Sequence, residues 1–387
     1  MILLIASDWR FYKRFISFDP ANSMTDIEWY DPLVEVKPST TAAELPKSSF
    51  NEKFSKNARQ ELLNFAESTG TKALLIWHMG GLSLEWYGDG FDRYSYMESA
   101  SMHKSVLVIL YGIAIDKGCI SSIDEKASKY ITEWQADNRK NISIRDMLQM
   151  ASGLSRIPGG FSPFGENMQF MMGSNSEKIA LEVKAEQDPG KSFAYSNLNS
   201  QLLGILLERA CSESYAKFLQ DNLWSKVAES SSWVYLDRPD GLAKTSGSLF
   251  TPARNWLRLG LLYLNEGSVD EVQVVPKPWL RKVITPSRLN PNYGLHIWLG
   301  TNYEPKRGYG EGLSVHVPQK EAFLANDVIY FDGAQGQRVY IVPSKDLVIV
   351  RTGDGEIDFQ TGAFSWDESE LPNMVIRGLA DLDNARP

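Results

Sequence analysis

The ten residues 106–115 limit the fold of this chain more than any other feature, because they are apolar on every side of a helix. A surface helix has a polar face and these residues have none, so we expect a helix that runs through the middle of a domain. Ser101 and Lys104 stand at its start. Three residues correspond to about 300° of helical rotation, so the two side chains should lie on the same face, one turn apart.

This pair has the chemistry of a nucleophile and its base. An amine that an apolar helix partly removes from water has a lowered pKa, and it can then take the proton of a serine hydroxyl. The Ser-x-x-Lys pattern alone is weak, since a second copy, Ser214 and Lys217, lies in the amphipathic segment 208–223, where we expect a helix face in water. The alternative for Ser101 is an N-cap serine followed by a surface lysine, so further motifs have to decide.

Length and composition set broad limits. The 387 residues exceed the usual size of one domain, so we expect one large core or two interleaved cores. The net charge of -8 is small and the 40 Lys and Arg residues form no basic run, which argues against nucleic acid as a partner. Cys119, Cys211 and the four histidines have neither disulfide nor metal-site spacing, so no cofactor is expected. His103 points to a different helix face from Ser101, so we do not expect it to be catalytic.

The amino terminus bears on localisation. Residues 1–6 are apolar, and an aromatic and basic segment follows at 9–14. Six apolar residues are too few for a signal peptide or a membrane span, so the sequence as it stands predicts a cytoplasmic protein. The alternative is that these residues end an anchor that starts upstream, which would place the protein in the periplasm or on a membrane. Membrane association is expected only in that case, and no feature indicates an oligomeric state.

The order of the predicted elements indicates an α+β fold. Residues 1–48 lack a sustained period, so we expect an arm packed on the surface of the main body. Helical spacing, β-branched runs and turn residues then predict a helix (50–68), a hairpin (72–77 and 82–87), the buried helix, an almost wholly helical region to about residue 230, a helix (247–267), strands (294–299, 328–331, 337–342 and 347–352) and a terminal helix (368–382). We therefore expect an antiparallel sheet flanked by N- and C-terminal helices, with an inserted all-helical domain. The predicted boundaries are an arm at 1–48 and a catalytic domain at 49–387, with its α/β part at about 49–104 and 240–387 and the helical insertion at about 105–239.

Two features of the helical region carry further expectations. Ser122 with Glu125 and Ser143 with Asp146 resemble capping boxes and predict helix starts. Residues 157–173 interrupt the helical pattern with glycines and prolines among phenylalanines and methionines. A loop of this length inside a compact domain is functional or mobile, and its apolar content suggests that it covers a pocket.

Three motifs together resemble those of the serine β-lactamase and penicillin-binding-protein superfamily, in particular the branch with class C β-lactamases, esterases and 6-aminohexanoate-dimer hydrolases. Ser101-Met102-His103-Lys104 resembles the first motif, Tyr195-Ser196-Asn197 resembles the second, Tyr-x-Asn, and residues 144–154 resemble the helix-to-loop segment between them. The resemblance runs from about residue 50 to residue 382. It implies a β-lactamase/transpeptidase-like fold. Without it, Tyr195 reads as a packed tyrosine in a capping segment.

The resemblance also implies roles by position. Ser101 corresponds to the nucleophile that accepts the acyl group, and Lys104 with Tyr195 corresponds to its proton-transfer pair. Asn197 corresponds to the residue that orients the lysine and the substrate. A lysine ammonium beside a phenol favours the phenolate, so the two would titrate as a coupled pair and either is a candidate base.

The third motif departs from the family pattern. β-Lactamases of this kind carry Lys-Thr-Gly on a strand beside the active site and related enzymes carry His-x-Gly, whereas residues 328–337 contain no cation. Residues 333–337 instead resemble the Gly-x-x-Gly-Gln turn of the amide hydrolases and esterases, which argues against an efficient β-lactamase or peptidoglycan carboxypeptidase. The implied oxyanion hole combines the Ser101 amide with a second backbone amide between Phe331 and Gln335. The supporting residues are Phe331, Gly333, Ala334 and Gln335.

Together the motifs predict a serine hydrolase of the esterase or amidase type that acts on a small ester, amide or peptide-like substrate through an acyl-enzyme. The chain has no Gly-x-Ser-x-Gly elbow, so an α/β-hydrolase is not a rival. The alternatives are a receptor or sensor module that acylates once or not at all, and a weak β-lactamase or D-amino acid peptidase. A base retained beside a nucleophile counts against a pure binding module.

Overall fold

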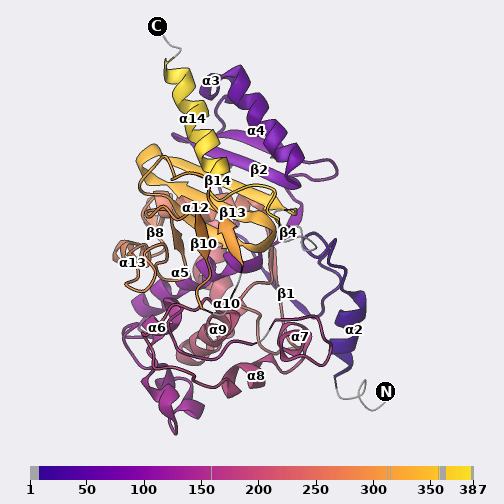
Figure 1. Ribbon diagram of the computed structural model, residues 1–387, viewed down its shortest axis with the longest axis vertical. Coiled ribbons are helices and arrows are strands. Elements are labelled where there is room, and N and C mark those ends of the chain that lie inside the picture. The colour runs from indigo at the N-terminus through magenta and orange to yellow at the C-terminus, as the bar shows by residue number, and fades with distance from the viewer. Residues whose placement is uncertain are drawn as a thin grey trace.

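A six-stranded antiparallel sheet with the strand order β3-β2-β14-β13-β12-β9 forms the centre of the molecule (Figure 1). The computed structural model describes residues 8–384 except 158, 312, 314, 356 and 358–362. The predicted hairpin turns at Met79 and Gly80, which both have positive φ angles, as a two-residue hairpin turn requires. The strands are β2 (Thr71–His78), β3 (Gly81–Tyr87), β9 (Trp298–Leu299), β12 (Ile329–Gly333), β13 (Gln337–Val342) and β14 (Leu347–Gly353).

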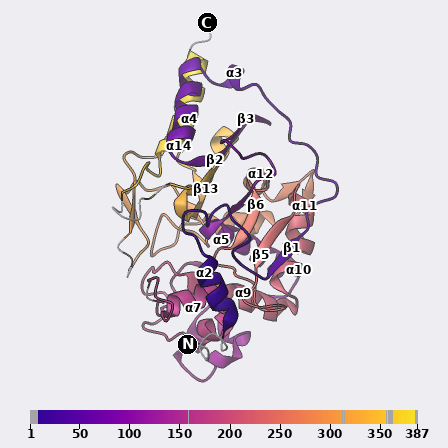
Figure 2. The same ribbon diagram turned by 90° about the vertical axis from the view of Figure 1, so that its right-hand side faces the viewer.

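Helices cover both faces of this sheet, which explains why its strands are apolar almost throughout. Successive side chains of a strand point to opposite faces, so Leu74 of β2 lies in one core cluster and Leu75 lies in the other. Helix α12 (Ala253–Leu264) packs on one face. Helices α4 (Lys56–Ser68) and α14 (Glu370–Asn384) lie side by side on the other face (Figures 1 and 2). The sheet is thus a middle layer between helices, as the predicted α+β fold requires.

The N-terminal arm contains regular structure, although its sequence has no sustained period. It forms helix α2 (Trp9–Ser17) and strand β1 (Leu33–Val36). Strand β1 pairs with β5 (Ser232–Tyr235) in a second sheet of order β1-β5-β6-β4, which β6 (Leu249–Pro252) and β4 (Tyr96–Glu98) complete. The partner of β1 is about two hundred residues away in the chain, so a local sequence pattern could not reveal the pairing.

A buried arginine ties the arm to the helical region. Arg14 of α2 is fully buried and donates hydrogen bonds to the carbonyl oxygens of Met172 (2.6 Å), Asp237 (2.9 Å) and Asp31 (3.0 Å). Helix α2 contacts helix α7 (Glu166–Met172), and the two lie close together in both ribbon views (Figures 1 and 2). The arm therefore holds in place a helix that contributes to the pocket described below.

The apolar helix lies in the core, as predicted. Helix α5 (His103–Asp116) is buried at every position from His103 to Ala114, and the short 3-10 helix η1 (Ala100–Met102) precedes it. Lys104 is only 1% exposed. Gly118 follows the helix with a positive φ angle and ends it. A lysine in this position loses nearly all contact with water.

The region after α5 is less helical than predicted. Among the described residues, α9 (Asn197–Cys211) is its one long helix, and turns and short helices form much of the rest. The capping box at Ser143 is present, because its hydroxyl and the Asp146 carboxylate each accept the other residue's backbone N–H. Ser122 starts no helix, since its hydroxyl accepts the N–H of Asp124 within a turn. The other elements are η2 (Ala127–Lys129), η3 (Thr132–Trp134), η4 (Asn138–Asn141), α6 (Ile144–Leu148), α7, α8 (Ser176–Glu182), α10 (Tyr215–Leu219), η5 (Gln220–Trp224) and α11 (Ser225–Val227).

The predicted helix at 50–68 is two helices. A short helix α3 (Phe50–Lys53) ends where Phe54 becomes extended. Ser55 then starts α4, because its side chain accepts the backbone N–H of Ala58 at 3.2 Å. The helical spacing of apolar residues continues across this break, which is why the sequence pattern did not show it.

Two other boundaries also differ from prediction. The helix expected at 247–267 begins later, as α12, because residues 249–252 form β6 and pair with β4 and β5. The strand expected at 294–299 shortens to β9, since a turn at Gly294 precedes it. The boundaries of the arm, the catalytic domain and the helical insertion remain predictions. The remaining elements are β7 (Ser268–Val269), β8 (Val272–Gln273), α13 (Lys277–Val283), β10 (Lys306–Gly308), β11 (His316–Pro318), η6 (Ala334–Gly336) and η7 (Pro343–Lys345).

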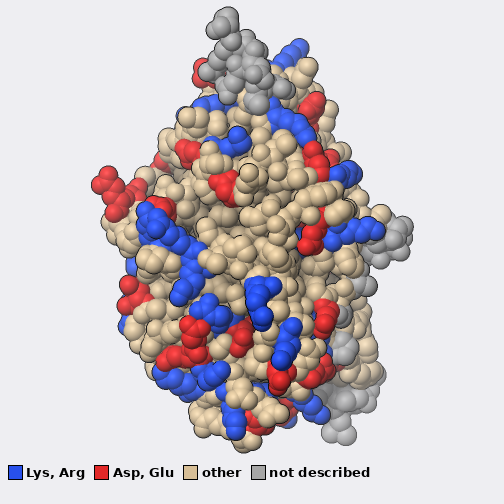
Figure 3. Space-filling view, turned by 60° about the vertical axis from the view of Figure 1, so that its left-hand side comes forward, with Lys and Arg blue, Asp and Glu red and all other residues tan. Residues whose placement is uncertain are grey.

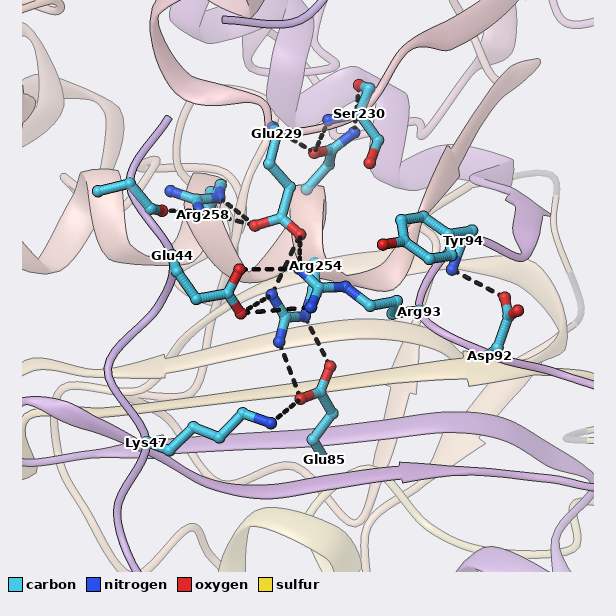
Figure 4. A network of polar contacts seen from close by, with 12 residues as sticks. Glu44, Lys47, Glu85, Asp92, Arg93, Tyr94, Glu229, Ser230, Arg254 and Arg258 are labelled. Atoms are coloured by element: carbon cyan, nitrogen blue, oxygen red, sulfur yellow. Dashed lines mark hydrogen bonds and ion pairs between the residues drawn. The ribbon is translucent and has the colours of Figure 1, made fainter. Parts of the chain in front are cut away.

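A cluster of charged side chains joins the arm, the central sheet and α12 (Figure 4). Arg254 of α12 is fully buried and forms ion pairs with Glu85 of β3 (2.6 Å), Glu44 of the arm (2.8 Å) and Glu229 (3.2 Å). Arg93 pairs with Glu44 and Glu229 as well. The cluster therefore fixes the relative positions of segments that are far apart in the chain.

Surface charge and helix length bear on the expected partners. On the face shown in Figure 3, basic side chains stand next to acidic ones over much of the surface. In the part of the chain that the structure describes, none of the helices has the length and apolar character that a membrane span needs. The apolar residues 1–6 lie outside the described residues, so the anchor alternative remains a prediction.

Candidate active site

The first motif brings its serine and lysine together. Lys104 Nζ donates hydrogen bonds to Ser101 Oγ at 2.9 Å, to Asn197 Oδ1 at 2.9 Å and to the carbonyl oxygen of Ser246 at 2.5 Å. The first of these bonds follows from the spacing of three residues at the start of α5. The second bond joins the first motif to the second, because Asn197 belongs to the second motif and stands at the start of α9.

The three donated hydrogen bonds belong to the ammonium form of Lys104, and its pKa sets how readily the neutral, proton-accepting amine forms. Burial lowers its pKa to about 7, although the negative charges of Asp332 and Glu98 raise it in part. Since the loss of water disfavours the ammonium form, a large fraction of the amine is neutral near pH 7.

A strained turn presents the serine. Ala100, directly before Ser101, has a left-handed backbone with a φ angle of 45°. The Glu98 carboxylate accepts the backbone N–H groups of Ala100 at 2.9 Å and Ser248 at 2.5 Å, which holds this turn against the neighbouring strand. Such backbone strain persists only where the surroundings enforce it. Sequence reasoning missed Glu98, because no motif marks its role.

Tyr195 stands in the wall of the same site. Ser196 caps α9 by accepting the N–H of Leu198, and this places Tyr195 at the pocket, where its ring stacks on Trp298 at 5.8 Å. The ring centre lies 5.2 Å from Lys104 Nζ, and the phenol interacts with the Ser101 hydroxyl. Burial and the charge of Asp332 raise the Tyr195 pKa above its ordinary value, so the phenol is protonated at neutral pH. Of the two candidate bases, the raised pKa of Tyr195 and the lowered pKa of Lys104 favour the lysine.

The strand of the third motif places a carboxylate beside the pocket. Asp332 of β12 is buried and lines the pocket wall. It accepts hydrogen bonds from Tyr309 Oη at 2.9 Å and Arg307 at 3.0 Å, and it pairs with Arg338 at 2.6 Å. Burial disfavours its charge, but the two arginines outweigh that effect and leave its pKa below the ordinary value. Sequence reasoning noted the missing cation on this strand but missed the two buried arginines, because it did not show that Arg338 of β13 and Arg307 of β10 both contact Asp332.

The predicted supporting residues occupy different positions. Phe331 is fully buried in the core, whereas Ala334 and Gln335 line the pocket together with the nucleophile. Gly333 lies against η1, and a Cβ there would stand 2.5 Å from the carbonyl oxygen of Ser99. The close approach of β12 to the serine turn therefore requires glycine at this position.

A cavity of about 380 Å³ borders the nucleophile. The segment expected to cover a pocket, 157–173, contributes Ile157, Gly159, Asn167 and Phe170 to its lining. Phe161 and Phe164 are instead 69% and 76% exposed, so that expectation is correct for only part of the segment. The aliphatic and phenylalanine residues of the lining are Ile157, Phe170, Leu198, Leu313, Val315, Val317, Ala334, Ile357 and Phe364.

Other candidate residues lie outside the site or have structural partners. His103 Nδ1 faces the carbonyl oxygen of Gly247 at 2.5 Å and Nε2 faces the hydroxyl of Tyr215 at 2.8 Å, inside the core. Lys217 of the second Ser-x-x-Lys copy is a surface residue between Glu213 and Asp221, as predicted. The described part of the chain contains no cluster of side chains suited to a metal ion.

Comparisons with known proteins agree with this arrangement. The model of the Beta-lactamase family matches residues 66–356. The chain is 22% identical over 317 residues to the 6-aminohexanoate-dimer hydrolase of Paenarthrobacter ureafaciens, which covers 74% of this chain and 73% of that protein. A solved structure of a putative 6-aminohexanoate-dimer hydrolase from Bacillus anthracis superposes with a TM-score of 0.76 at 20% identity, over 95% of this chain and 96% of the other. A putative beta-lactamase from Bacteroides dorei gives a TM-score of 0.66 at 17% identity, over 84% and 98%. These two structural likenesses show the fold alone, and they confirm the predicted α+β, β-lactamase/transpeptidase-like class.

Proposed function

The chain belongs to the beta-lactamase family, and we propose that it is a serine hydrolase that cleaves an ester or amide bond through an acyl-enzyme on Ser101. The observation that carries the proposal is the 2.9 Å hydrogen bond between Lys104 Nζ and Ser101 Oγ at the pocket wall. A binding site alone has no need for a base beside a nucleophile. The substrate is a small ester, amide or peptide-like molecule that fits a largely apolar cavity of about 380 Å³.

In the proposed acylation, Ser101 Oγ attacks the substrate carbonyl carbon while its proton passes to the neutral amine of Lys104. The backbone amide of Ser101 and a second amide between Phe331 and Gln335 hold the oxyanion, and each such donor typically contributes about 3 kcal/mol. The bond to the leaving group then breaks, and the proton that Lys104 accepted passes through Tyr195 to the leaving group. Water repeats these steps on the acyl-enzyme, which releases the acid and restores Ser101.

The electrostatics of the site support Lys104 as the base and Tyr195 as the proton relay. Burial lowers the pKa of Lys104 to about 7, so the amine accepts a proton near neutral pH. Burial raises the pKa of Tyr195, so its phenol keeps its proton and can donate it. Asn197 supports this division, because its side-chain oxygen accepts a hydrogen bond from Lys104 and orients the amine.

Covalent labelling tests the proposal. Intact-protein mass after incubation with a fluorophosphonate probe should show one adduct on the wild type and none on Ser101→Ala, because the activated Oγ displaces fluoride from phosphorus. An activated ester such as 4-nitrophenyl acetate should then turn over many times on the wild type alone. An adduct without turnover would support the receptor or sensor alternative, and an adduct on Ser101→Ala would show that another residue is the nucleophile.

The pH dependence of labelling tests the assignment of the base. The second-order rate constant for phosphonylation should rise with pH around an apparent pKa of about 7, since the fraction of neutral Lys104 amine grows as pH increases through its pKa. If the Tyr195 phenolate were the base, the rise would lie above the ordinary tyrosine pKa of 10.0. Stopped-flow or quenched labelling of the wild type from about pH 5 to pH 10, at constant ionic strength, distinguishes Lys104 from Tyr195 as the base.

A further inference from the structure

We propose that Arg156 recognises an anion in this pocket and that the preferred substrates carry a carboxylate. This inference rests on the proposed function, since it concerns the substrate of the same site. Arg156 lies in the segment between α6 and α7, in the pocket lining, and is half-buried. No sequence motif marked this residue.

The guanidinium of Arg156 is fixed in place but only partly satisfied. One terminal nitrogen donates to the carbonyl oxygen of Tyr195 and, at 3.1 Å, to that of Tyr309. The other terminal nitrogen and Nε are buried and have no hydrogen-bond partner among the described residues. Buried donors without partners are costly, so Arg156, a residue of the pocket lining, has unused donor capacity beside the backbone of Tyr195.

The positive charge of Arg156 is also poorly compensated. Asp332, the pocket's carboxylate, is already occupied by Arg307 and Arg338. Glu311 acts on Arg156 only at a distance, and it is an exposed residue that accepts a hydrogen bond from Gln187. Burial consequently lowers the pKa of Arg156 below its ordinary value, although arginine remains charged at neutral pH.

A carboxylate is the chemical group that fits these properties. The planar guanidinium presents paired N–H donors that match the two oxygens of a carboxylate, and such charge-assisted bonds are strong where water is largely excluded. The strand of the third motif carries Asp332 and no cation at the pocket, so anion recognition in this chain falls to the segment between α6 and α7. The carboxylate could belong to the acyl part of the substrate or to its leaving group, because both positions share this chemistry. Two pairs of substrates distinguish these positions.

Matched esters test the proposal. The acyl pair is 4-nitrophenyl hydrogen glutarate and the similarly shaped neutral 4-nitrophenyl 5-methylhexanoate. The leaving-group pair is 4-carboxyphenyl acetate and 4-isopropylphenyl acetate. For one of these pairs, the ratio of kcat/KM for the anionic over the neutral ester should be about 10-fold or more higher in the wild type than in Arg156→Met, mainly through KM. Comparing the two proteins removes differences in intrinsic ester reactivity.

Two further measurements guard against a general effect on folding. Arg156→Lys keeps the charge and should retain part of the preference, and free glutarate should inhibit hydrolysis of the neutral ester in the wild type more strongly than in Arg156→Met. Equal ratios for both pairs in wild type and Arg156→Met would overturn the proposal. Since neutral esters and the fluorophosphonate report on Ser101 itself, the absence of any anion preference that depends on Arg156, together with intact labelling, contradicts only this inference. Absence of labelling contradicts the proposed function.

Discussion

Replacing Lys104 with alanine is expected to slow acylation of Ser101 by about 100- to 10,000-fold, the usual contribution of a general base. The amine accepts the serine proton in the proposed mechanism, and its 2.9 Å bond to Ser101 Oγ is the contact that is lost. Because the lysine is buried and its ammonium form is disfavoured there, we expect the variant to fold. The measurement is the second-order rate constant for fluorophosphonate labelling, followed by intact mass, with circular dichroism to verify folding.

The second Ser-x-x-Lys copy provides a matched control. Lys217 lies on the surface between two carboxylates, with 59% of its side chain exposed. Lys217→Ala and Ser214→Ala should therefore leave labelling unchanged. Near wild-type labelling by Lys104→Ala would refute the mechanism, and a large loss in Ser214→Ala would show that the wrong motif had been assigned.

Replacing Arg254 with methionine is expected to lower the free energy of unfolding by about 3 to 5 kcal/mol, because it leaves the carboxylates of a largely buried cluster without their central cation. Glu85 and Glu229 are only 15% and 10% exposed at their side chains, so water replaces the lost ion pairs poorly. Urea unfolding at pH 7, followed by fluorescence of the tryptophans, measures the change.

The dependence of this effect on pH has a definite sign. Burial opposes ionisation of Glu85, but its bonds to Arg254 outweigh burial and leave its pKa below the ordinary value of 4.5. A carboxylate with a depressed pKa stabilises the folded state above its unfolded pKa, and this stabilisation is lost as pH falls through the folded value. The difference between wild type and Arg254→Met should therefore shrink below about pH 4.

An exposed ion pair is the control for Arg254. Lys178 and Glu182 lie 4.0 Å apart on α8, with 71% and 67% of their side chains exposed. Lys178→Met should change the free energy of unfolding by no more than about 1 kcal/mol. A similarly small change for Arg254→Met would mean that the cluster of Figure 4 contributes little to stability.

Local patterns predicted the parts of the site that are close in sequence. The spacing of Ser101 and Lys104 placed both side chains on one turn, and the structure brings them to 2.9 Å. The unbroken apolar run predicted that α5 would be buried, which accounts for the lowered pKa of Lys104 to about 7. The resemblance to the family's second motif indicated that Tyr195 and Asn197 would join this pair, although they lie far along the chain.

Groups whose partners come from distant segments escaped prediction. Glu98 supports the serine turn by accepting the backbone N–H groups of Ala100 and Ser248, and no motif in the adjacent sequence indicates that role. The sequence showed that the strand of the third motif carries no cation. The ion pair of Asp332 with Arg338 and its hydrogen bond from Arg307 could be recognised only once the strands were placed next to each other. Arg156 reads as an ordinary polar residue until the structure shows that it lines the pocket and that two of its nitrogens have no hydrogen-bond partner among the described residues.

The sequence by itself determined the features that depend on neighbouring residues: the buried helix, the hairpin at 71–87, the pairing of Ser101 with Lys104, and the α+β class. Periodicity and spacing suffice there, because the interactions lie within a turn of helix or between adjacent strands. The tertiary structure alone decided the strand pairing of the arm, the charge of the pocket wall and the protonated state of Tyr195. Each of these depends on burial and on contacts between separate segments that only the folded chain brings together, which no local pattern contains.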